Sequence, residues 1–217
     1  MGIYVGFDPG GIGAFGWAVL TGKAFPLQLV GCGTADHAQS AFEAARRCAG
    51  DKFNAVGIDA PLFWNPAGDR YADQIVRTAI TKLGSRGGTV GSVNSLRGAC
   101  LIQGILVAMM CQQMLDQGSH ITEAHPKALL WLLGKATRTH RPDMIALNDL
   151  HDYFVMSGTQ GANDHERDAS LGAISAFAAQ TRPSAWQDLF CLEPNPITPL
   201  DPSPGYWMPL SLEKPSK

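Results

Sequence analysis

The sequence predicts an α/β fold, in which a mixed β-sheet is flanked by helices. Three strand-like segments joined by short turns open the chain, and helical and strand-like segments alternate from residue 36 onwards. Consecutive strands joined by short turns pair antiparallel, whereas alternation with helices is typical of parallel strands covered by helices. The first part of the chain therefore has the expected order β-β-β-α-β.

The three opening strands are expected over residues 3–8, 13–20 and 27–33. The first is rich in β-branched and aromatic residues and stops at a Pro-Gly-Gly turn. In the second, large apolar residues occupy alternate positions, which is typical of a half-buried strand. The third follows Pro26. Short turns between them predict an antiparallel meander.

A helix is expected next, over residues 36–49, with Asp36 as its N-cap and Gly50 as its end. Residues 54–59 then have the composition of a buried strand. Apolar residues between 72 and 83 follow the spacing of one helical face, so this segment is predicted to be an amphipathic helix.

The second half of the chain continues the alternation. Residues 84–91 contain several glycines and are expected to form a loop. Residues 96–116 are apolar on nearly every side, so we expect a central, buried helix. Further elements are a strand at 119–124 and helices at 127–133, 143–156 and 164–180.

The last part of the chain differs in composition. Residues 194–217 hold seven of the 14 prolines and are expected to form an extended segment that runs over the surface. We therefore predict one domain over residues 1–193, followed by a proline-rich tail. Tyr206 and Trp207 in this tail are expected to pack on the same domain or on a second subunit, so a homodimer is an open alternative.

Composition excludes several classes of protein. Charged residues make up 17% of the 217 residues, against roughly 25% in an average soluble domain, and the net charge is −2. This argues against a disordered chain, a coiled coil and a globally basic nucleic-acid binder. An odd number of cysteines without a CxxC pair indicates a reducing compartment. With no basic leader and no apolar run of spanning length, we expect a cytoplasmic protein without a membrane segment.

Two aspartates end buried-type strands in matching contexts. Asp8 follows Val-Gly-Phe, and Asp59 follows Val-Gly-Ile, so each has a glycine two residues earlier on the same face of its strand. Such a face is expected to leave open space beside a carboxylate. Two carboxylates at neighbouring strand ends would form a divalent-cation site. The structural alternative is that each aspartate only caps a loop.

Two further acids join this prediction. Glu123 ends the strand at 119–124, and Asp168 lies one turn into the final helix, three residues after His165. A stripe of small residues follows Asp168 and allows the helix to approach a sheet closely. The stripe consists of Ala169, Gly172, Ala173 and Ala176. The structural alternatives are a solvated edge position for Glu123 and a position on the helix surface for His165.

Together these motifs resemble the ribonuclease-H-like superfamily, including Holliday-junction resolvases. The resemblance rests on the first strand with its Gly-rich turn (FDPGGIGAFGWAV), the strand-end acid in VGIDAP, and His-x-x-Asp-Ala on the late helix. IDAPLFW, the helix with Arg70, Asp73 and Arg77, TEAHPKALL and DHERDASLGAISAFAA are similar to the uncharacterised family called domain of unknown function 429. The resemblance covers residues 1 to about 181.

The resemblance implies a mixed five-stranded sheet in the order β-β-β-α-β-α-β-α, with the first and fourth strands adjacent. It implies that Asp8, Asp59 and Asp168 bind Mg²⁺ or Mn²⁺, with Glu123 as a fourth acid. The implied activity is hydrolysis of nucleic-acid phosphodiester bonds by a two-metal mechanism, with His165 at the metal or orienting water. The second acid of resolvases is usually glutamate, whereas this chain has the shorter Asp59.

Basic side chains are the candidates for binding DNA or RNA. The substrate-binding candidates are Arg70, Arg77, Arg86, Arg97, Lys127 and Arg138, with Lys135 and Arg141 nearby in sequence. The alternative for each is ordinary solvated surface, and for the Arg70–Asp73–Arg77 helix a surface ion pair. Two rival functions stay open. One is a non-catalytic binding or scaffold protein that has this fold, and the other is an ATP-binding protein of the actin or sugar-kinase type.

Overall fold

The computed structural model describes residues 2–50, 52–65, 69–91, 98–156 and 163–210. In these residues the chain forms a mixed eight-stranded sheet with the order β6-β3-β2-β1-β4-β5-β8-β7. The strands are β1 (Gly2–Asp8), β2 (Phe15–Gly22), β3 (Leu27–Ala35), β4 (Phe53–Ile58), β5 (Leu115–Glu123), β6 (Phe154–Met156), β7 (Gln187–Asp188) and β8 (Gly205–Met208). The α/β class is confirmed, but the sheet has eight strands rather than five, because three short strands extend its two edges.

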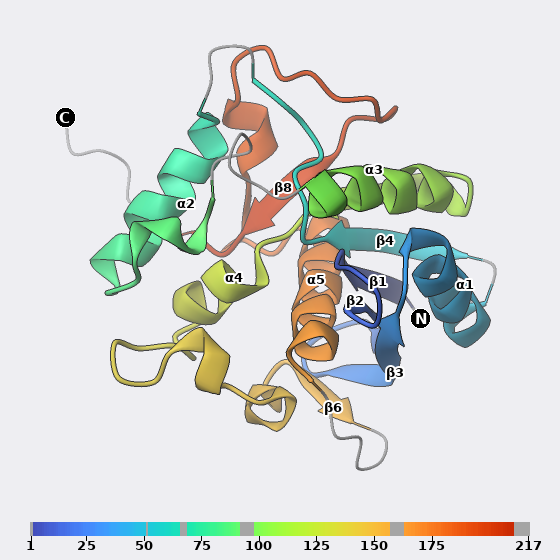
Figure 1. Ribbon diagram of the computed structural model, residues 1–217, viewed down its shortest axis with the longest axis horizontal. Coiled ribbons are helices and arrows are strands. Elements are labelled where there is room, and N and C mark those ends of the chain that lie inside the picture. Colours follow the sequence, from blue (N-terminus) through green and yellow to red (C-terminus); the bar gives the residue numbers. More distant parts are fainter. Residues whose placement is uncertain (1, 51, 66–68, 92–97, 157–162, 211–217) are drawn as a thin grey trace.

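Helices cover both faces of the sheet (Figure 1). The α-helices are α1 (Ala38–Ala49), α2 (Tyr71–Lys82), α3 (Gly98–Gln112), α4 (Pro126–Leu132) and α5 (Asp164–Thr181). The 3₁₀ turns are η1 (Gly87–Thr89), η3 (Pro142–Met144), η4 (Leu147–Leu150) and η5 (Leu189–Leu192). Helix α5 crosses β1, β2 and β4 on one face, and α1 and α3 pack together on the other. None of the helices in the described residues is long and apolar enough to span a bilayer.

The centre of the sheet has the predicted pairing. Strand β2 pairs antiparallel with β1 and β3, whereas β4 pairs parallel with both β1 and β5. The first and fourth strands are therefore adjacent, as expected. Beyond the last ladder pair, the backbone N–H of Asp59 donates to the carbonyl of Phe7 over 2.9 Å. The C-terminal ends of β1 and β4 consequently place Asp8 and Asp59 at the same edge of the sheet.

Glycines allow α5 to lie directly against the strands. A Cβ atom at Gly6 would lie 1.7 Å from the carbonyl oxygen of Ala169, and one at Gly57 would lie 2.0 Å from that of Gly172. The expectation that these glycines leave open space beside the aspartates is therefore wrong, because the backbone of α5 fills that space. The predicted close approach of the small-residue stripe is confirmed.

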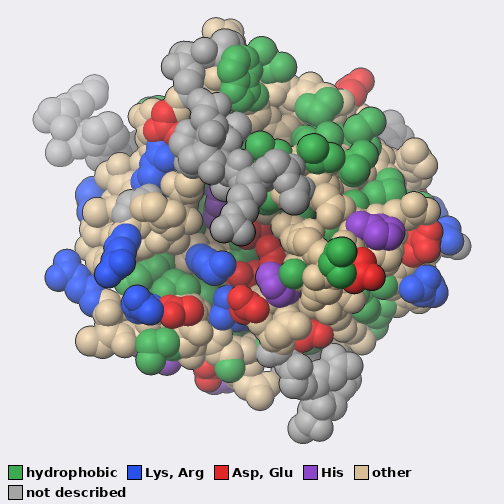
Figure 2. Space-filling view, in the orientation of Figure 1, with side chains coloured by type: hydrophobic (Ala, Val, Ile, Leu, Met, Phe, Trp, Pro, Cys, Tyr) green, Lys and Arg blue, Asp and Glu red, His purple; other side chains and the backbone are tan. Residues whose placement is uncertain are grey.

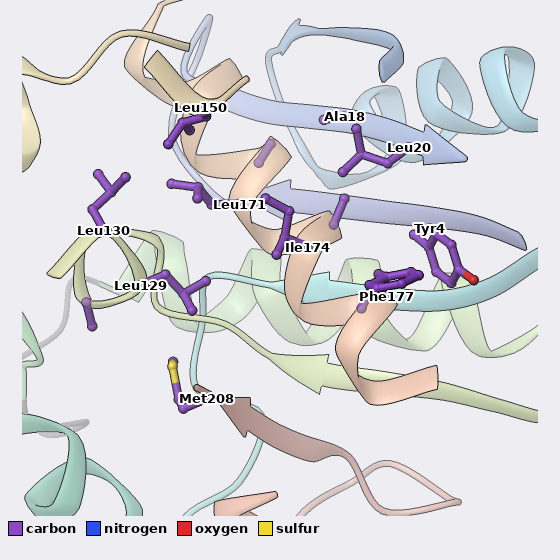
Figure 3. Close-up of a cluster of buried hydrophobic side chains, with 14 of the residues drawn as sticks. Tyr4, Ala18, Leu20, Leu129, Leu130, Leu150, Leu171, Ile174, Phe177 and Met208 are labelled. Atoms are coloured by element: carbon purple, nitrogen blue, oxygen red, sulfur yellow. The ribbon is translucent and has the colours of Figure 1, made fainter. Parts of the chain in front are cut away.

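Each face of the sheet has its own hydrophobic core. On the α5 face, Phe177 stacks edge-on against Tyr4 with ring centroids 5.1 Å apart. Figure 3 shows how leucines from α4, η4 and α5 and Met208 from β8 fill the same layer. On the other face, alternate β1 and β2 side chains pack against α1 and α3. Alternation along the strands thus supplies two cores from one sheet.

Helix α1 begins one residue later than expected. His37 is the N-cap, because its ring accepts a hydrogen bond from the backbone N–H of Ser40, and Gly50 ends the helix as predicted. Asp36, the predicted cap, instead accepts from the backbone N–H of Gly13. Asp36 therefore ties the first turn to the end of β3.

Helix α3 lies at the surface, so the expectation of a central, buried helix is wrong. Ile102 is 64% exposed, and Leu106 and Met109 are each about half exposed. Only one side of the helix, which includes Val107 and Ala108, is buried against the sheet layer. An apolar composition on every side does not specify which side of a helix packs against the sheet.

The helix predicted over residues 143–156 is absent from the structure. The segment forms the short turns η3 and η4 and the strand β6, which pairs parallel with β3. The guanidinium of Arg167 takes hydrogen bonds with the carbonyls of Pro142 and Ile145, over 3.0 and 2.9 Å. A side chain of α5 thus binds both carbonyls, and the carbonyl of Pro142 also accepts from the backbone N–H of Ile145 within η3.

Part of the proline-rich segment belongs to the sheet instead of running over the surface. Strand β8 pairs parallel with β5 and antiparallel with β7. Tyr206 is fully buried, and its hydroxyl donates to Asp73 over 3.3 Å. Tyr206 therefore packs on its own domain, which was the first of the two alternatives for this side chain.

Candidate metal centre and the adjacent pockets

Three of the predicted acids meet at the carboxyl edge of β1 and β4. Asp8 and Asp59 line a pocket of about 180 Å³ together with Lys127, and the ammonium of Lys127 lies 3.5 Å from a carboxylate oxygen of Asp168. We call Asp8, Asp59 and Asp168 the acidic centre. Two of its members come from parallel strands and the third from the helix that crosses them.

His165 is brought to the acidic centre as predicted. Its Nδ1 lies 2.7 Å from Oδ2 of Asp8, and this hydrogen bond raises the pKa of the imidazole. The position follows from close packing, since a Cβ at Gly16 would lie 2.2 Å from the carbonyl oxygen of His165. The first turn of α5 is thus fixed against β2, and the imidazole holds the Asp8 carboxylate in one orientation.

Asp59 carries the least favourable charge of the three. Removal from water and the nearby carboxylates of Asp8 and Asp168 raise its pKa to about 8, although His125 opposes the effect. Nδ1 of His125 lies 3.9 Å from Oδ1 of Asp59. A carboxyl group that is disfavoured as an anion by its acidic neighbours would be stabilised by a bound cation.

Asp168 is almost fully buried and has two basic partners. Arg167 donates to Oδ1 through two nitrogens, at 2.8 and 2.7 Å, and Lys127 approaches Oδ2. Burial nevertheless raises the pKa of Asp168, with Asp8 adding to the rise and Arg167 opposing it. Burial alone would lower the pKa of Lys127, but Asp168, Asp59 and Asp8 raise it, so the ammonium stays charged.

Glu123 lies outside the acidic centre. Its two oxygens accept hydrogen bonds from Arg70, and Oε2 also accepts from the backbone N–H of Leu62 at 3.0 Å. His125 stands between Glu123 and Asp59, with its Nε2 2.9 Å from Oε1 of Glu123. The structure therefore does not bring Glu123 together with the three aspartates, and its carboxylate is occupied by donors behind His125.

Arg70 is likewise not placed to bind a substrate. It is 1% exposed and bonds both Asp73 and Glu123, so the alternative of a surface ion pair is wrong as well. The guanidinium also lies 4.4 Å from the ring centroid of Phe63. The sequence pattern identified Arg70 and Asp73 as partners. It did not indicate that both side chains are buried together with Glu123 at the end of β5.

One group of described residues has ligand atoms that all lie within 4.8 Å of one another, namely Asp73, Glu123 and His125. It does not suit a cation, because the guanidinium of Arg70 already bonds both oxygens of each carboxylate. Burial raises the pKa of Asp73, and its bonds with Arg70 oppose that rise. The ligand atoms of Asp8, Asp59 and Asp168 do not all lie this close together, but Asp8 and Asp59 line an open pocket.

Two residues near the centre were not predicted. His125 follows the end of β5 by two residues and lines the pocket, so its place after a strand end was an available signal. Burial lowers the pKa of His125, but the hydrogen bond with Glu123 outweighs it, and the pKa is raised. Arg167 had no comparable signal, since its partners are carbonyls of a segment expected to be helical.

The predicted basic residues divide between a second pocket and other places. Arg86, Arg138 and Arg141 line a pocket of about 580 Å³, which Lys127 also lines. Figure 2 shows blue side chains close to red and purple ones on one face of the molecule. Of the others, Arg77 pairs with Asp69, Lys135 pairs with Asp152, and Arg97 lies outside the described residues.

Searches of the sequence against models of known protein families and against curated proteins return no match.

Proposed function

We propose that this protein is a metal-dependent nuclease that hydrolyses phosphodiester bonds of DNA or RNA on a ribonuclease-H-like fold. One observation carries the proposal. Asp8 and Asp59, from adjacent parallel strands, line one pocket, and Asp168 from the helix that crosses these strands is close enough to raise the pKa of Asp59. Three carboxylates in one place are costly in the absence of a cation, and oxygen ligands suit Mg²⁺ or Mn²⁺.

The fold supports this proposal through its central strands. The order β3-β2-β1-β4-β5, with β2 antiparallel to its neighbours and β4 parallel to its own, agrees with the plan that the resemblance implies. Strands β6, β7 and β8 are additions at the edges. The fold argument concerns architecture only, and the function argument rests on the acidic centre.

In this proposal Asp8, Asp59 and Asp168 hold Mg²⁺ or Mn²⁺, which would supply charge stabilisation and a water of lowered pKa. The residues of the chain then have separate tasks. His165 fixes the orientation of Asp8 through the 2.7 Å contact. Lys127, which is half exposed beside Asp168, presents a positive charge to a phosphate in the pocket. Arg167 anchors Asp168 by its two bonds to Oδ1.

A specific observation favours a second candidate, a non-catalytic binding protein. Each acid of the centre already has a basic neighbour, namely His165 for Asp8, His125 for Asp59, and Arg167 with Lys127 for Asp168. A set of ion pairs of this kind is self-sufficient without metal. The two candidates differ in whether a divalent cation binds and activates the site.

The purified chain is incubated with Mn²⁺ or Mg²⁺ and with single-stranded, duplex, hybrid and branched nucleic acids. The proposal expects cleavage of at least one substrate with Mn²⁺, none with EDTA, and none with Asp59→Asn. The matched control is Asp116→Asn, because Asp116 is an exposed aspartate that pairs with Lys52 away from the centre. Cleavage that survives in Asp59→Asn, or no cleavage of any substrate, would contradict the proposal.

A further inference from the structure

The second pocket is strongly basic. Its wall includes Arg86, Lys127, Arg138 and Arg141, and among the described residues the only acid that lines it is Asp143. That aspartate is engaged, since its Oδ2 lies 2.9 Å from a nitrogen of Arg141. We call this set of four cations and the space they surround the basic pocket. Its charge balance favours an anionic ligand.

Two of the cations have no carboxylate partner among the described residues. Arg86 and Arg138 make no ion pair there, whereas Lys127 is near Asp168 and Arg141 is paired. The stem of Arg138 is held in place, because it packs over Gly84 so closely that a Cβ at Gly84 would lie 2.4 Å from its Cγ. Guanidinium groups without a carboxylate partner are suited to bidentate binding of phosphate.

The basic pocket and the pocket of the acidic centre share a wall. Thr89 and Lys127 line both of them. Thr89 is held by the turn η1, where its hydroxyl donates to the carbonyl of Arg86 over 2.9 Å. A ligand that is long enough to pass Lys127 therefore reaches both spaces at once.

Trp131 supplies an independent observation. It lines the basic pocket and is 4% exposed, and its indole N–H makes no hydrogen bond with the described residues. A buried donor without a partner is rare in folded proteins and calls for an explanation. The wall of the basic pocket thus combines cations without partners with a polar group left unsatisfied.

We propose that the basic pocket binds a second phosphate of the substrate, next along the strand to the phosphate at the acidic centre. This inference deepens the proposed function and rests on it for the role of the first phosphate. The volume of about 580 Å³ is in the range of pockets that bind small molecules or single nucleotide units. The substrate class is accordingly a phosphodiester chain with at least two phosphates, rather than a mononucleotide.

Binding is measured by fluorescence anisotropy with a labelled short oligodeoxythymidylate in EDTA, so that no cleavage occurs. Replacing both cations without partners, in the double variant Arg86→Gln with Arg138→Gln, is expected to weaken binding about 10-fold or more and to reduce its salt dependence. The matched control is Arg47→Gln, an exposed arginine on α1, which should bind as the unchanged protein does. Equal affinity of the double variant and the control would overturn the proposal.

Location and substrate class have their own readouts. The chain has five tryptophans, and Trp131→Phe assigns one indole N–H signal in a nitrogen-resolved NMR spectrum. This signal should shift when the oligonucleotide binds. Inorganic phosphate and thymidine monophosphate should bind more weakly than the oligonucleotide, and a mononucleotide that binds equally well would overturn the two-phosphate proposal.

The outcomes separate the two proposals. Arginine-dependent binding in EDTA, with no cleavage in Mn²⁺, would support the basic pocket and contradict the nuclease. Cleavage in Mn²⁺ with oligonucleotide binding unaffected by the double variant would support the nuclease and overturn the basic pocket.

Discussion

Arg70 binds both carboxylate oxygens of Glu123, with contacts of 2.7 Å to Oε1 and 2.9 Å to Oε2. Both side chains are at most 1% exposed, so the pair is fully removed from water. The same guanidinium bonds Asp73, which connects the start of α2 to the end of β5. The charge of Glu123 is therefore used to hold elements together beside the acidic centre.

Glu123→Gln is expected to destabilise the protein by about 3 kcal/mol at neutral pH, because it leaves the charge of Arg70 only partly compensated in a buried place. Urea unfolding of the metal-free protein measures this. Glu43→Gln serves as the control, since the one side-chain partner of Glu43 among the described residues is Gln39, in an exposed contact on α1. A loss below about 1 kcal/mol would contradict a structural role for the pair.

The stabilisation from Glu123 should disappear in acid. Burial alone would raise the pKa of Glu123, but the charge of Arg70 and the hydrogen bond of His125 lower it to about 2. A group with a lowered folded-state pKa contributes stability above its unfolded value, here 4.5, and loses it as the pH falls toward 2. The stability difference between the unchanged protein and Glu123→Gln should therefore shrink between pH 4.5 and pH 2. A difference that stays constant over this window would contradict the assignment.

Mn²⁺ is expected to raise the Tm of the unchanged protein. At a concentration 100 times the Kd, binding should add about 2.7 kcal/mol to the free energy of unfolding. Asp8→Asn and Asp168→Asn should remove the rise while the circular dichroism spectrum stays folded. Asp116→Asn, at the exposed pair with Lys52, should retain it. If millimolar Mn²⁺ shifts no Tm, the acidic centre is not a metal site.

Asp59→Asn should have two opposite effects. Because burial and the neighbours Asp8 and Asp168 disfavour the ionised carboxyl, removing its charge should raise the metal-free Tm by a few degrees at pH 8 and above. The same change should abolish the stabilisation by Mn²⁺. Thermal scans with EDTA and with Mn²⁺ measure both, and a variant with lower metal-free Tm would contradict the unfavourable placement of this charge.

Gly6→Ala is expected to destabilise the protein by about 3 kcal/mol or to prevent folding, because the new Cβ would lie 1.7 Å from the carbonyl of Ala169. Gly11→Ala is the control. A Cβ there would meet nothing within 4 Å, so stability should change by no more than about 0.5 kcal/mol. Urea unfolding compares the two, and similar stabilities would show that α5 does not lie directly on β1.

The sequence predicted the elements that follow strong local patterns. The matched Gly-x-Asp segments placed Asp8 and Asp59 at neighbouring strand ends, and small residues after Asp168 predicted the close approach of α5. Both predictions succeeded because side-chain size and alternation along a strand determine the geometry, and both are local properties of the sequence. The expected gap beside the aspartates was wrong for a related reason. The glycines of the strands face the small residues of α5, so the backbone of α5 occupies the space beside the glycines.

The remaining errors come from tertiary contacts that no local pattern records. Arg167 binds the carbonyls of Pro142 and Ile145 in the segment where a helix was expected at 143–156. Glu123 became buried because Arg70 and the backbone of Leu62 bind it from another part of the chain. Because α3 is apolar on nearly every side, the sequence did not indicate which side packs, and only one side is buried in the structure. Sequence reasoning thus located the three aspartates and His165, but not His125 and Arg167 beside them.

Strand β8 affects the order in which the protein can fold during its synthesis. It lies beside β5, and its Tyr206 fills a buried place against Asp73 and Phe63, so the outer half of the sheet stays incomplete until residue 208 has left the ribosome. Contacts between such distant parts of a chain form slowly. A nascent chain that has already made β5 exposes an open edge, the kind of surface that chaperones protect and that pairs wrongly with neighbouring chains.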